Sequence, residues 1–260
     1  MCTVSWLRLR GGYELFCNRD ERHTRKPAGP PVIRDARGVR FIAPVDGDHG
    51  GSWIGVNEAG VALCLLNRYE GAATTPNGVK HSPDDVKPED GYRSRGLLLT
   101  SLTDSLTASH AHARLSGADL SRYRPFTMLV LSAHEPALLV YWANGEKTFD
   151  GAGEASMPLT SSSYRGADVI ASRKSLFRRM TDEAGAVTPS LLREFHRSHA
   201  PARGAYSVCM HRGDAATVSF SRVKVGGREV EFSYQPASPC VMARPACARL
   251  PLRREVLQAQ

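Results

Sequence analysis

The first seventeen residues constrain the fold more than any other part of the sequence. Residues 3–10 alternate β-branched or aromatic side chains with polar ones, Gly11-Gly12 follows, and residues 13–17 continue as a second short strand. Two such runs joined by two glycines are typical of a β-hairpin. Because the second strand returns toward the start of the chain, we expect the hairpin to bring residues 18–21 (Asn-Arg-Asp-Glu) beside Cys2.

Cys2 becomes the first residue of the chain if Met1 is removed, which we expect because cysteine is small. A thiol and a free α-amine then share one residue, with ordinary pKa values of about 8.5 and about 7.7–8.0. A terminal amine can activate a neighbouring nucleophile. Cys2 is therefore a candidate nucleophile, and Asp20 is a candidate carboxylate that orients its amine.

Length and composition indicate one globular domain over residues 1–260. The chain exceeds the usual ~100–200 residues of a domain, but β-rich domains reach this size. Hydrophobic residues make up 42% and charged residues 23%, as in ordinary soluble proteins. No apolar run approaches the ~18–20 residues of a membrane span, so stable membrane insertion is not expected. Arg8 and Arg10 interrupt any secretory signal, which favours a cytoplasmic protein.

The six cysteines and the net charge of +8 exclude some classes of function. The cysteines are scattered without a C-x-x-C pair, which predicts reduced thiols rather than a disulfide framework. The arginines are dispersed, and no nucleic-acid-binding motif accompanies them. We expect a basic surface that favours small anionic partners, and no nucleic acid.

The remaining pattern predicts strands and helices in separate groups. Residues 22–35 are expected to be a loop, 70–92 a flexible loop, and 241–260 a peripheral basic tail. Hydrophobic periodicity predicts helices over 95–113, 167–180 and 190–196, and short strands over 39–42, 51–56, 61–66, 126–131, 137–142, 206–210, 217–223 and 230–234. This order lacks β-α-β-α alternation, so it favours an α+β fold of two packed antiparallel sheets with helices outside.

Several segments closely resemble the NRDE family, also called the transport and Golgi organisation protein 2 family. They are Met1-Cys2-Thr-Val, the tetrapeptide at 18–21 that gives the family its name, residues 51–60, and Leu65-Leu-Asn67. Segments 207–212 and 217–221 and the Pro239-Cys240 pair are similar too. The resemblance extends over nearly the whole chain.

A more distant resemblance is to choloylglycine hydrolases and penicillin V acylases. These are N-terminal-nucleophile hydrolases with an αββα sandwich. The resemblance implies that Cys2 attacks an amide carbonyl, that Asp20 contacts the α-amine, and that Asn67 helps to bind the oxyanion, a large electrostatic contribution in acyl transfer.

The sequence departs from that hydrolase pattern at two positions. The hydrolases carry an arginine three residues before the aspartate, where this chain has Cys17. Arg19 is nearby, but adjacent residues of a strand face opposite sides. A second oxyanion asparagine corresponds to Ser161, and a helical Ser-Arg pair has a loose match in Ser172-Arg173.

Other candidate residues have a structural alternative beside the functional one. Arg19 is a candidate catalytic residue or the partner of Glu21 in an ion pair. Ser161, Arg173 and Trp53 are candidate substrate-binding residues, although Trp53 is first expected to pack in the core. Asn67 is alternatively a strand-end cap, and Asn57 is expected to shape a turn.

Two histidine pairs, His110 with His112 and His196 with His199, have a loosely metal-like spacing. No nearby cysteine or carboxylate completes a zinc set, so we interpret these histidines as surface residues and expect no metal.

Two functions follow. The first is an N-terminal-cysteine amidohydrolase or acyltransferase that acts on a small acyl amide or thioester and requires no cofactor. The alternative is a non-enzymatic carrier of haem or of acyl-CoA-type lipids, in which a cysteine or histidine ligates the haem iron. The oligomeric state is not predicted.

Overall fold

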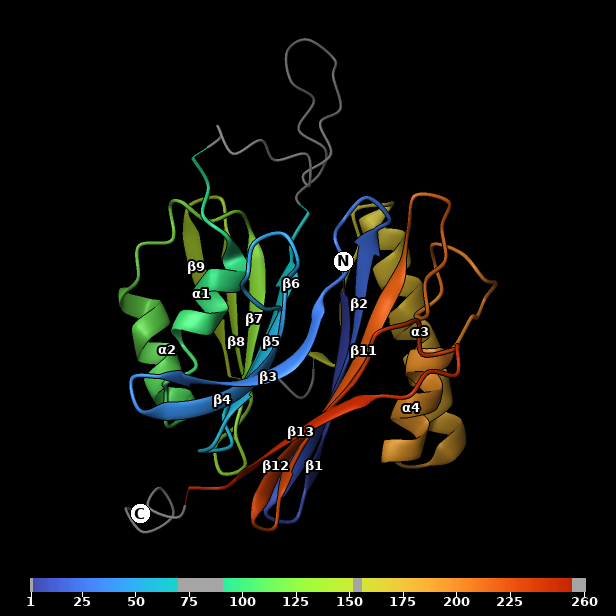
Figure 1. Cartoon of the computed structure of the whole chain (residues 1–260). Helices are drawn as coiled ribbons and strands as arrows, with labels where there is room; N and C mark the ends of the chain where they lie inside the picture. Colours follow the sequence, from blue (N-terminus) through green and yellow to red (C-terminus); the bar gives the residue numbers. More distant parts are fainter. Residues whose placement is uncertain (1, 70–90, 152–155, 254–260) are drawn as a thin grey trace.

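A computed structural model of the chain describes residues 2–69, 91–151 and 156–253 (Figure 1). Met1, most of the loop predicted over 70–92, and the end of the tail lie outside the described residues.

Two antiparallel sheets pack face to face (Figure 1). The first sheet has the strand order β10 (Leu159–Ser161), β1 (Cys2–Leu9), β2 (Gly12–Arg22), β11 (Ala215–Gly226), β12 (Glu229–Gln235) and β13 (Ala246–Pro251). The second has the order β3 (Gly29–Ala36), β4 (Val39–Val45), β5 (Ile54–Asn57), β6 (Ala62–Asn67), β7 (Phe126–Leu131), β8 (Leu138–Ala143) and β9 (Glu146–Asp150).

A pair of helices covers the outer face of each sheet. Helices α1 (Arg95–Ser101) and α2 (Ala108–Gly117) cover the seven-stranded sheet, and α3 (Gly166–Ala184) and α4 (Pro189–Arg197) cover the six-stranded sheet (Figure 1). The predicted α+β class and the αββα layering are confirmed. Within the described ranges, no helix combines the length and the apolar character needed to cross a membrane.

Alternation along β1 shows how one strand serves two layers. Val4 and Trp6 are fully buried between the sheets, in the core that both sheets share. Ser5, between them, faces α4 and bonds to His196 at 2.8 Å. Buried polar groups require such partners, so the helix layer is held by hydrogen bonds as well as by apolar packing.

The predicted hairpin is confirmed. Leu9 pairs with Gly12 and Cys2 pairs with Arg19, with Gly11 in the turn at a φ of 73°. This positive φ is readily adopted by glycine. The register places Asp20 one residue beyond the partner of Cys2, so the Asn-Arg-Asp-Glu segment does arrive at the start of the chain.

Two predicted elements differ from the structure around β3 and α1. The second half of the predicted loop over 22–35 belongs to β3, which is Gly29–Ala36. This edge strand has its prolines at its start, where no central ladder is interrupted. The helix predicted over 95–113 is broken into α1 and α2. Asn57 donates to the carbonyl oxygens of Thr103 (2.9 Å) and Ser105 (2.7 Å), which ties down the connection between the two helices.

Two further predictions, late in the chain, also differ. Residues 206–210 are irregular rather than a strand, because side chains occupy their backbone carbonyls. Asn18 donates a hydrogen bond to the Val208 carbonyl, and the Ser207 hydroxyl donates to the Cys209 carbonyl. Residues 246–251 of the predicted tail form the edge strand β13.

Candidate functional site

The tetrapeptide at 18–21 is divided between the two faces of the six-stranded sheet. Cys17 lies in the core between the sheets, and Arg19 on the same face contacts Trp53 across it. Asn18 and Asp20 point the other way, toward the helices, where they meet α4 and α3. The period of two along a strand dictates this division.

Asp20 is fully buried in a polar cluster beneath α3. Its carboxylate accepts a hydrogen bond from the Thr217 hydroxyl at 2.6 Å and forms an ion pair with Arg173 at 3.3 Å. Neither side chain of the ion pair is exposed. Arg173 also donates to the hydroxyls of Thr3 (2.7 Å) and Thr160 (3.1 Å). These bonds compensate part of the cost of burying the cation and join α3 to β1 and β10, although Nε of Arg173 has no hydrogen-bond partner among the described residues.

Arg173 therefore supplies a cation to Asp20 in a chain that has Cys17 three residues before the aspartate. The expectation that Arg19 does not fill this role is consistent with its position on the opposite face. The loose match at Ser172-Arg173 already contained this residue, but nothing in the sequence indicated its contact with Asp20, 153 positions away.

Cys2 begins β1 between its two neighbouring strands. It pairs with Arg19 of β2 and with Ser161 of β10, and its backbone nitrogen donates to the Ser161 hydroxyl at 3.2 Å. Cys2 is 6% exposed. The structure thus brings together Cys2 and Ser161, with Asp20 one residue further along β2.

The thiol of Cys2 faces the space between the sheets, where two other cysteines lie. Cys2 donates a hydrogen bond to Cys17, and the sulfur of Cys17 lies 3.9 Å from that of Cys64. The hydrogen bond to Cys17, together with burial, raises the pKa of the Cys2 thiol well above its usual value. The thiol is therefore protonated at neutral pH and requires a base to become a nucleophile.

Arg19 shares this face with Cys2 and is held on three sides. Its guanidinium lies 4.1 Å from the centre of the Trp53 ring and forms ion pairs with Asp46 (2.5 Å) and Glu21 (3.4 Å). The predicted ion pair with Glu21 is present. Trp53 is 6% exposed and belongs to the core cluster, as first expected, yet its indole nitrogen is buried and has no hydrogen-bond partner among the residues that the structure describes.

The loop that carries Trp53 depends on a close approach between two glycines. A Cβ at Gly51 would lie 2.4 Å from the carbonyl carbon of Gly96 at the start of α1. Only glycine fits there, and the approach lets Ser52 donate its N–H to the Gly96 carbonyl at 3.2 Å.

Asn67 ends β6 in the other sheet. Its side-chain amide donates to the Tyr69 hydroxyl at 3.4 Å, and its backbone pairs with Phe126. Alternation along β6 places Cys64 and Leu66 between the sheets and Leu65 toward the helices, which assigns Asn67 to the face of Leu65. The oxyanion role stays a prediction.

Asn18 and His196 form a network that sequence reasoning missed. Asn18 donates to the carbonyls of His196 (2.9 Å) and Val208 (3.0 Å), so its side-chain oxygen accepts from His196 Nδ1 at 3.0 Å. His196 Nε2 then accepts from Ser5. Burial lowers the pKa of His196 to about 3. The expectation of a surface histidine is wrong for His196, which is fully buried.

His199, the other member of that pair, lies in a different group. Its ring meets His211 and two cysteines, Cys209 and Cys240, which are distant in sequence. Within the part of the chain that the structure describes, this is the group of side chains close enough together to hold a metal ion. The sequence did not indicate it because Cys240 is far along the chain from the other three.

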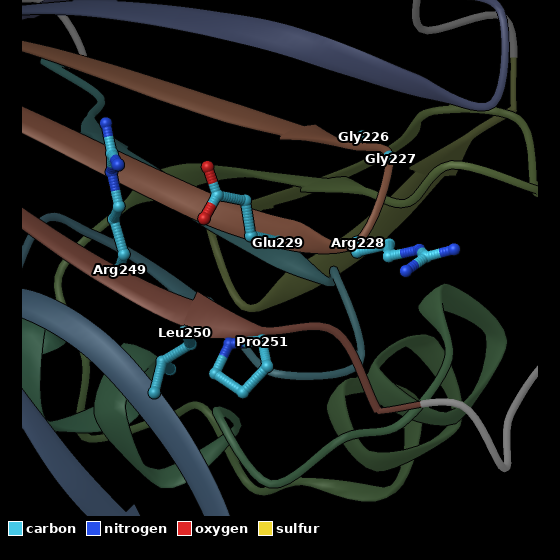
Figure 2. A pocket seen from close by; sticks show the side chains of 7 residues that line it. All are labelled: Gly226, Gly227, Arg228, Glu229, Arg249, Leu250 and Pro251. Carbon is cyan, nitrogen blue, oxygen red and sulfur yellow. The ribbon is translucent and has the colours of Figure 1, made fainter.

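A pocket lies at the opposite end of the six-stranded sheet from Cys2 (Figure 2). It is lined by the turn between β11 and β12 and by the end of β13: Gly226, Gly227, Arg228, Glu229, Arg249, Leu250 and Pro251. None of the candidate site residues lines it.

Comparison with solved structures defines the class of fold. The chain is similar to penicillin V acylase from Agrobacterium tumefaciens (TM-score 0.53, 12% identity, covering 100% of this chain and 88% of that one). It is similar to the C2A mutant of conjugated bile acid hydrolase from Clostridium perfringens (0.54, 10%, 98% and 93%). A third similar structure is the Caenorhabditis elegans orthologue of N-acylethanolamine-hydrolyzing acid amidase (0.52, 13%, 96% and 100%). The fold is that of N-terminal-nucleophile hydrolases.

The sequence itself identifies the family. Residues 1–199 match the model of the Transport and Golgi organisation 2 family, and the chain belongs to it. No curated protein matched the sequence significantly.

Proposed function

We propose that this protein is an N-terminal-cysteine hydrolase that cleaves a small acyl amide, with an acyl thioester as the related substrate. The observation that carries the proposal is the position of Cys2. It is the first residue of a central strand, its nitrogen contacts Ser161, and Asp20 lies one residue beyond its strand partner. Three solved structures of the same fold are hydrolases or acylases by name.

The reaction requires removal of Met1, which frees the α-amine of Cys2. The amine takes the thiol proton, and the thiolate attacks the substrate carbonyl carbon to form a tetrahedral intermediate. The carbon–nitrogen bond breaks, and the ammonium group returns the proton to the leaving amine. Water, deprotonated by the same amine, then hydrolyses the thioester and regenerates the thiol.

Asp20 fixes the amine in this scheme. Its carboxylate is held by Thr217 and Arg173 in a buried cluster, so its position is set before substrate binds. Such preorganisation favours catalysis because the group need not reorient during the reaction. Arg173 is a positioning residue that acts through Asp20.

The face between the sheets supplies groups for substrate. Ser161 lies beside the nucleophile on this face. The proposed oxyanion donors are a backbone N–H and Asn67; Asn67 lies on the helix-facing side of β6 and would have to turn at the strand end to reach the substrate. The indole N–H of Trp53, which has no partner in the described ranges, is a further donor, because a buried N–H without a partner costs about 1–3 kcal/mol and a substrate acceptor would remove that cost. Arg19 packs against Trp53 and keeps its ring in place.

A carrier of haem or acyl-CoA-type lipid is the second candidate. The raised pKa of the buried Cys2 thiol favours it, because a protonated thiol is a poor nucleophile. Titration with haemin tests it: a saturable Soret band supports a haem carrier, and no saturable binding of haemin or acyl-CoA excludes the carrier.

The enzyme proposal is tested by hydrolysis of a panel of N-acyl amides and acyl thioesters. Cys2→Ala should reduce kcat/KM by at least about 10³-fold, because the covalent step is lost. Asp20→Asn should lower kcat more than it raises KM. Cys247→Ala is the matched control, since Cys247 is an exposed cysteine outside the site. Equal turnover by wild type and Cys2→Ala would refute the proposal.

A further inference from the structure

Four metal-binding side chains from distant parts of the chain converge beyond the end of α4. They are His199, Cys209, His211 and Cys240, and their ligand atoms all lie within 4.8 Å of one another. Cys209 is buried and the other three are partly buried. Two imidazoles and two thiols are the complete ligand set of a structural zinc site with two histidine and two cysteine ligands.

The distances within this group match a tetrahedron around zinc. Typical Zn–N and Zn–S bonds place two nitrogens about 3.3 Å apart, and a nitrogen and a sulfur about 3.5 Å apart. Nε2 of His199 lies 3.2 Å from Nε2 of His211. The sulfurs of Cys209 and Cys240 each lie 3.5 Å from Nε2 of His211.

We propose that these four side chains bind one Zn²⁺ in a closed structural site. All four positions of a tetrahedral ion are taken by protein, so no position remains for a water nucleophile. The proposal is independent of the hydrolase function. It replaces the sequence-based expectation that His199 has no cysteine near it.

The backbone holds the ligands in place before any ion binds. The N–H of Cys209 donates to the carbonyl of Ser198, next to His199, at 3.0 Å. His211 forms an isolated bridge with Ala216 at the start of β11. Cys240 lies in a turn that Val241 closes by donating to the Ser238 carbonyl at 3.0 Å.

Zinc at this position would join three segments that share little regular structure. His199 follows α4, Cys209 and His211 precede β11, and Cys240 follows β12. Residues 198–210 form no helix or strand. A connection of this length without secondary structure is uncommon in a compact domain unless something constrains it, and metal binding contributes directly to folding free energy.

The site also connects to Asp20 through two residues. Met210, between Cys209 and His211, donates its N–H to the Thr217 hydroxyl at 2.8 Å, and that hydroxyl donates to Asp20. Zinc bound by Cys209 and His211, the two neighbours of Met210, would hold the Met210 backbone and this chain of hydrogen bonds in place. Zinc binding displaces the two thiol protons, so the ion and the two thiolates are neutral together.

The test is metal analysis of the purified full-length protein by mass spectrometry. We expect about one zinc per chain. Replacing zinc with Co²⁺ should give the visible absorption of tetrahedral cobalt and a thiolate-to-cobalt charge-transfer band. Cys240→Ser should retain less than about one tenth of the zinc and lose the charge-transfer intensity of one thiolate. Cys247→Ser, the same change at an exposed cysteine outside the cluster, should keep both.

Wild-type protein alone can overturn the proposal, whether or not the variant folds. Less than about a tenth of a zinc per chain after growth and dialysis with excess Zn²⁺, and no tetrahedral cobalt spectrum, would contradict it. An intact mass showing a Cys209–Cys240 disulfide in protein kept under reducing conditions would also overturn it. Equal zinc loss from Cys240→Ser and Cys247→Ser would show that the cluster is not the site.

Discussion

The ion pair between Asp20 and Arg173 gives the sharpest prediction about stability. Both side chains are fully buried, and their charged atoms lie 3.3 Å apart. At an effective dielectric constant of about 20, two unit charges at this distance attract by about 5 kcal/mol. Removing one partner of a buried pair typically costs 3–5 kcal/mol, because the other charge stays buried without compensation. Arg173→Met and Asp20→Asn should each lower the free energy of unfolding by roughly this amount.

The double variant isolates the interaction free energy between Asp20 and Arg173 from the contacts that each makes with other residues. In Arg173→Met/Asp20→Asn neither charge remains, so the loss should be smaller than the sum of the two single losses by about 2–3 kcal/mol. Such single losses are a large fraction of a typical stability of about 5–15 kcal/mol. Urea unfolding followed by circular dichroism measures all four proteins under one set of conditions. Losses that add to within about 0.5 kcal/mol would refute the coupling.

Three further predictions concern the support of the site. Burial lowers the pKa of His196 from its usual 6.5 to about 3, so the unfolded chain takes up a proton at a higher pH than the folded chain does. The contribution of His196 to stability is therefore complete above pH 6.5. It falls as the pH drops below 6.5, by up to about 1.4 kcal/mol per pH unit. Urea unfolding at pH 7 and pH 5 should show this slope, and His196→Gln should reduce it. Asn57→Ala should cost about 3 kcal/mol in urea unfolding, because the Thr103 and Ser105 carbonyls lose their donor. Gly51→Ala should cost about 1–3 kcal/mol, whereas Gly151→Ala, with open space around it, should cost far less by thermal unfolding.

The sequence determines the local geometry near the chain start well. A two-residue glycine turn leaves one register for the hairpin, so the proximity of Cys2 to the 18–21 segment followed directly. Alternation along the strand also indicated that Arg19 and Asp20 face opposite sides. Both conclusions depend on neighbours in sequence, where chain geometry leaves little freedom.

Contacts across the layers could not be predicted in the same way. Arg173 meets Asp20 only because α3 packs on the six-stranded sheet, and no periodic signal specifies which helical residue lies over which strand residue. The group of His199, Cys209, His211 and Cys240 depends likewise on two connections meeting, the one between α4 and β11 and the one between β12 and β13. Asn57 was predicted to shape a turn, and it does: its oxygen accepts from Ala59 and Val61. Its hydrogen bonds to the connection between α1 and α2 could not be predicted from the sequence.

The most direct measurement of the central claim is the mass of the protein after brief reaction with an activated acyl thioester. The account predicts a chain without Met1 that carries one acyl group, located on Cys2 in the N-terminal peptide and absent from Cys2→Ala. A chain that retains Met1, or an acyl group that persists at the same level in Cys2→Ala, would contradict it.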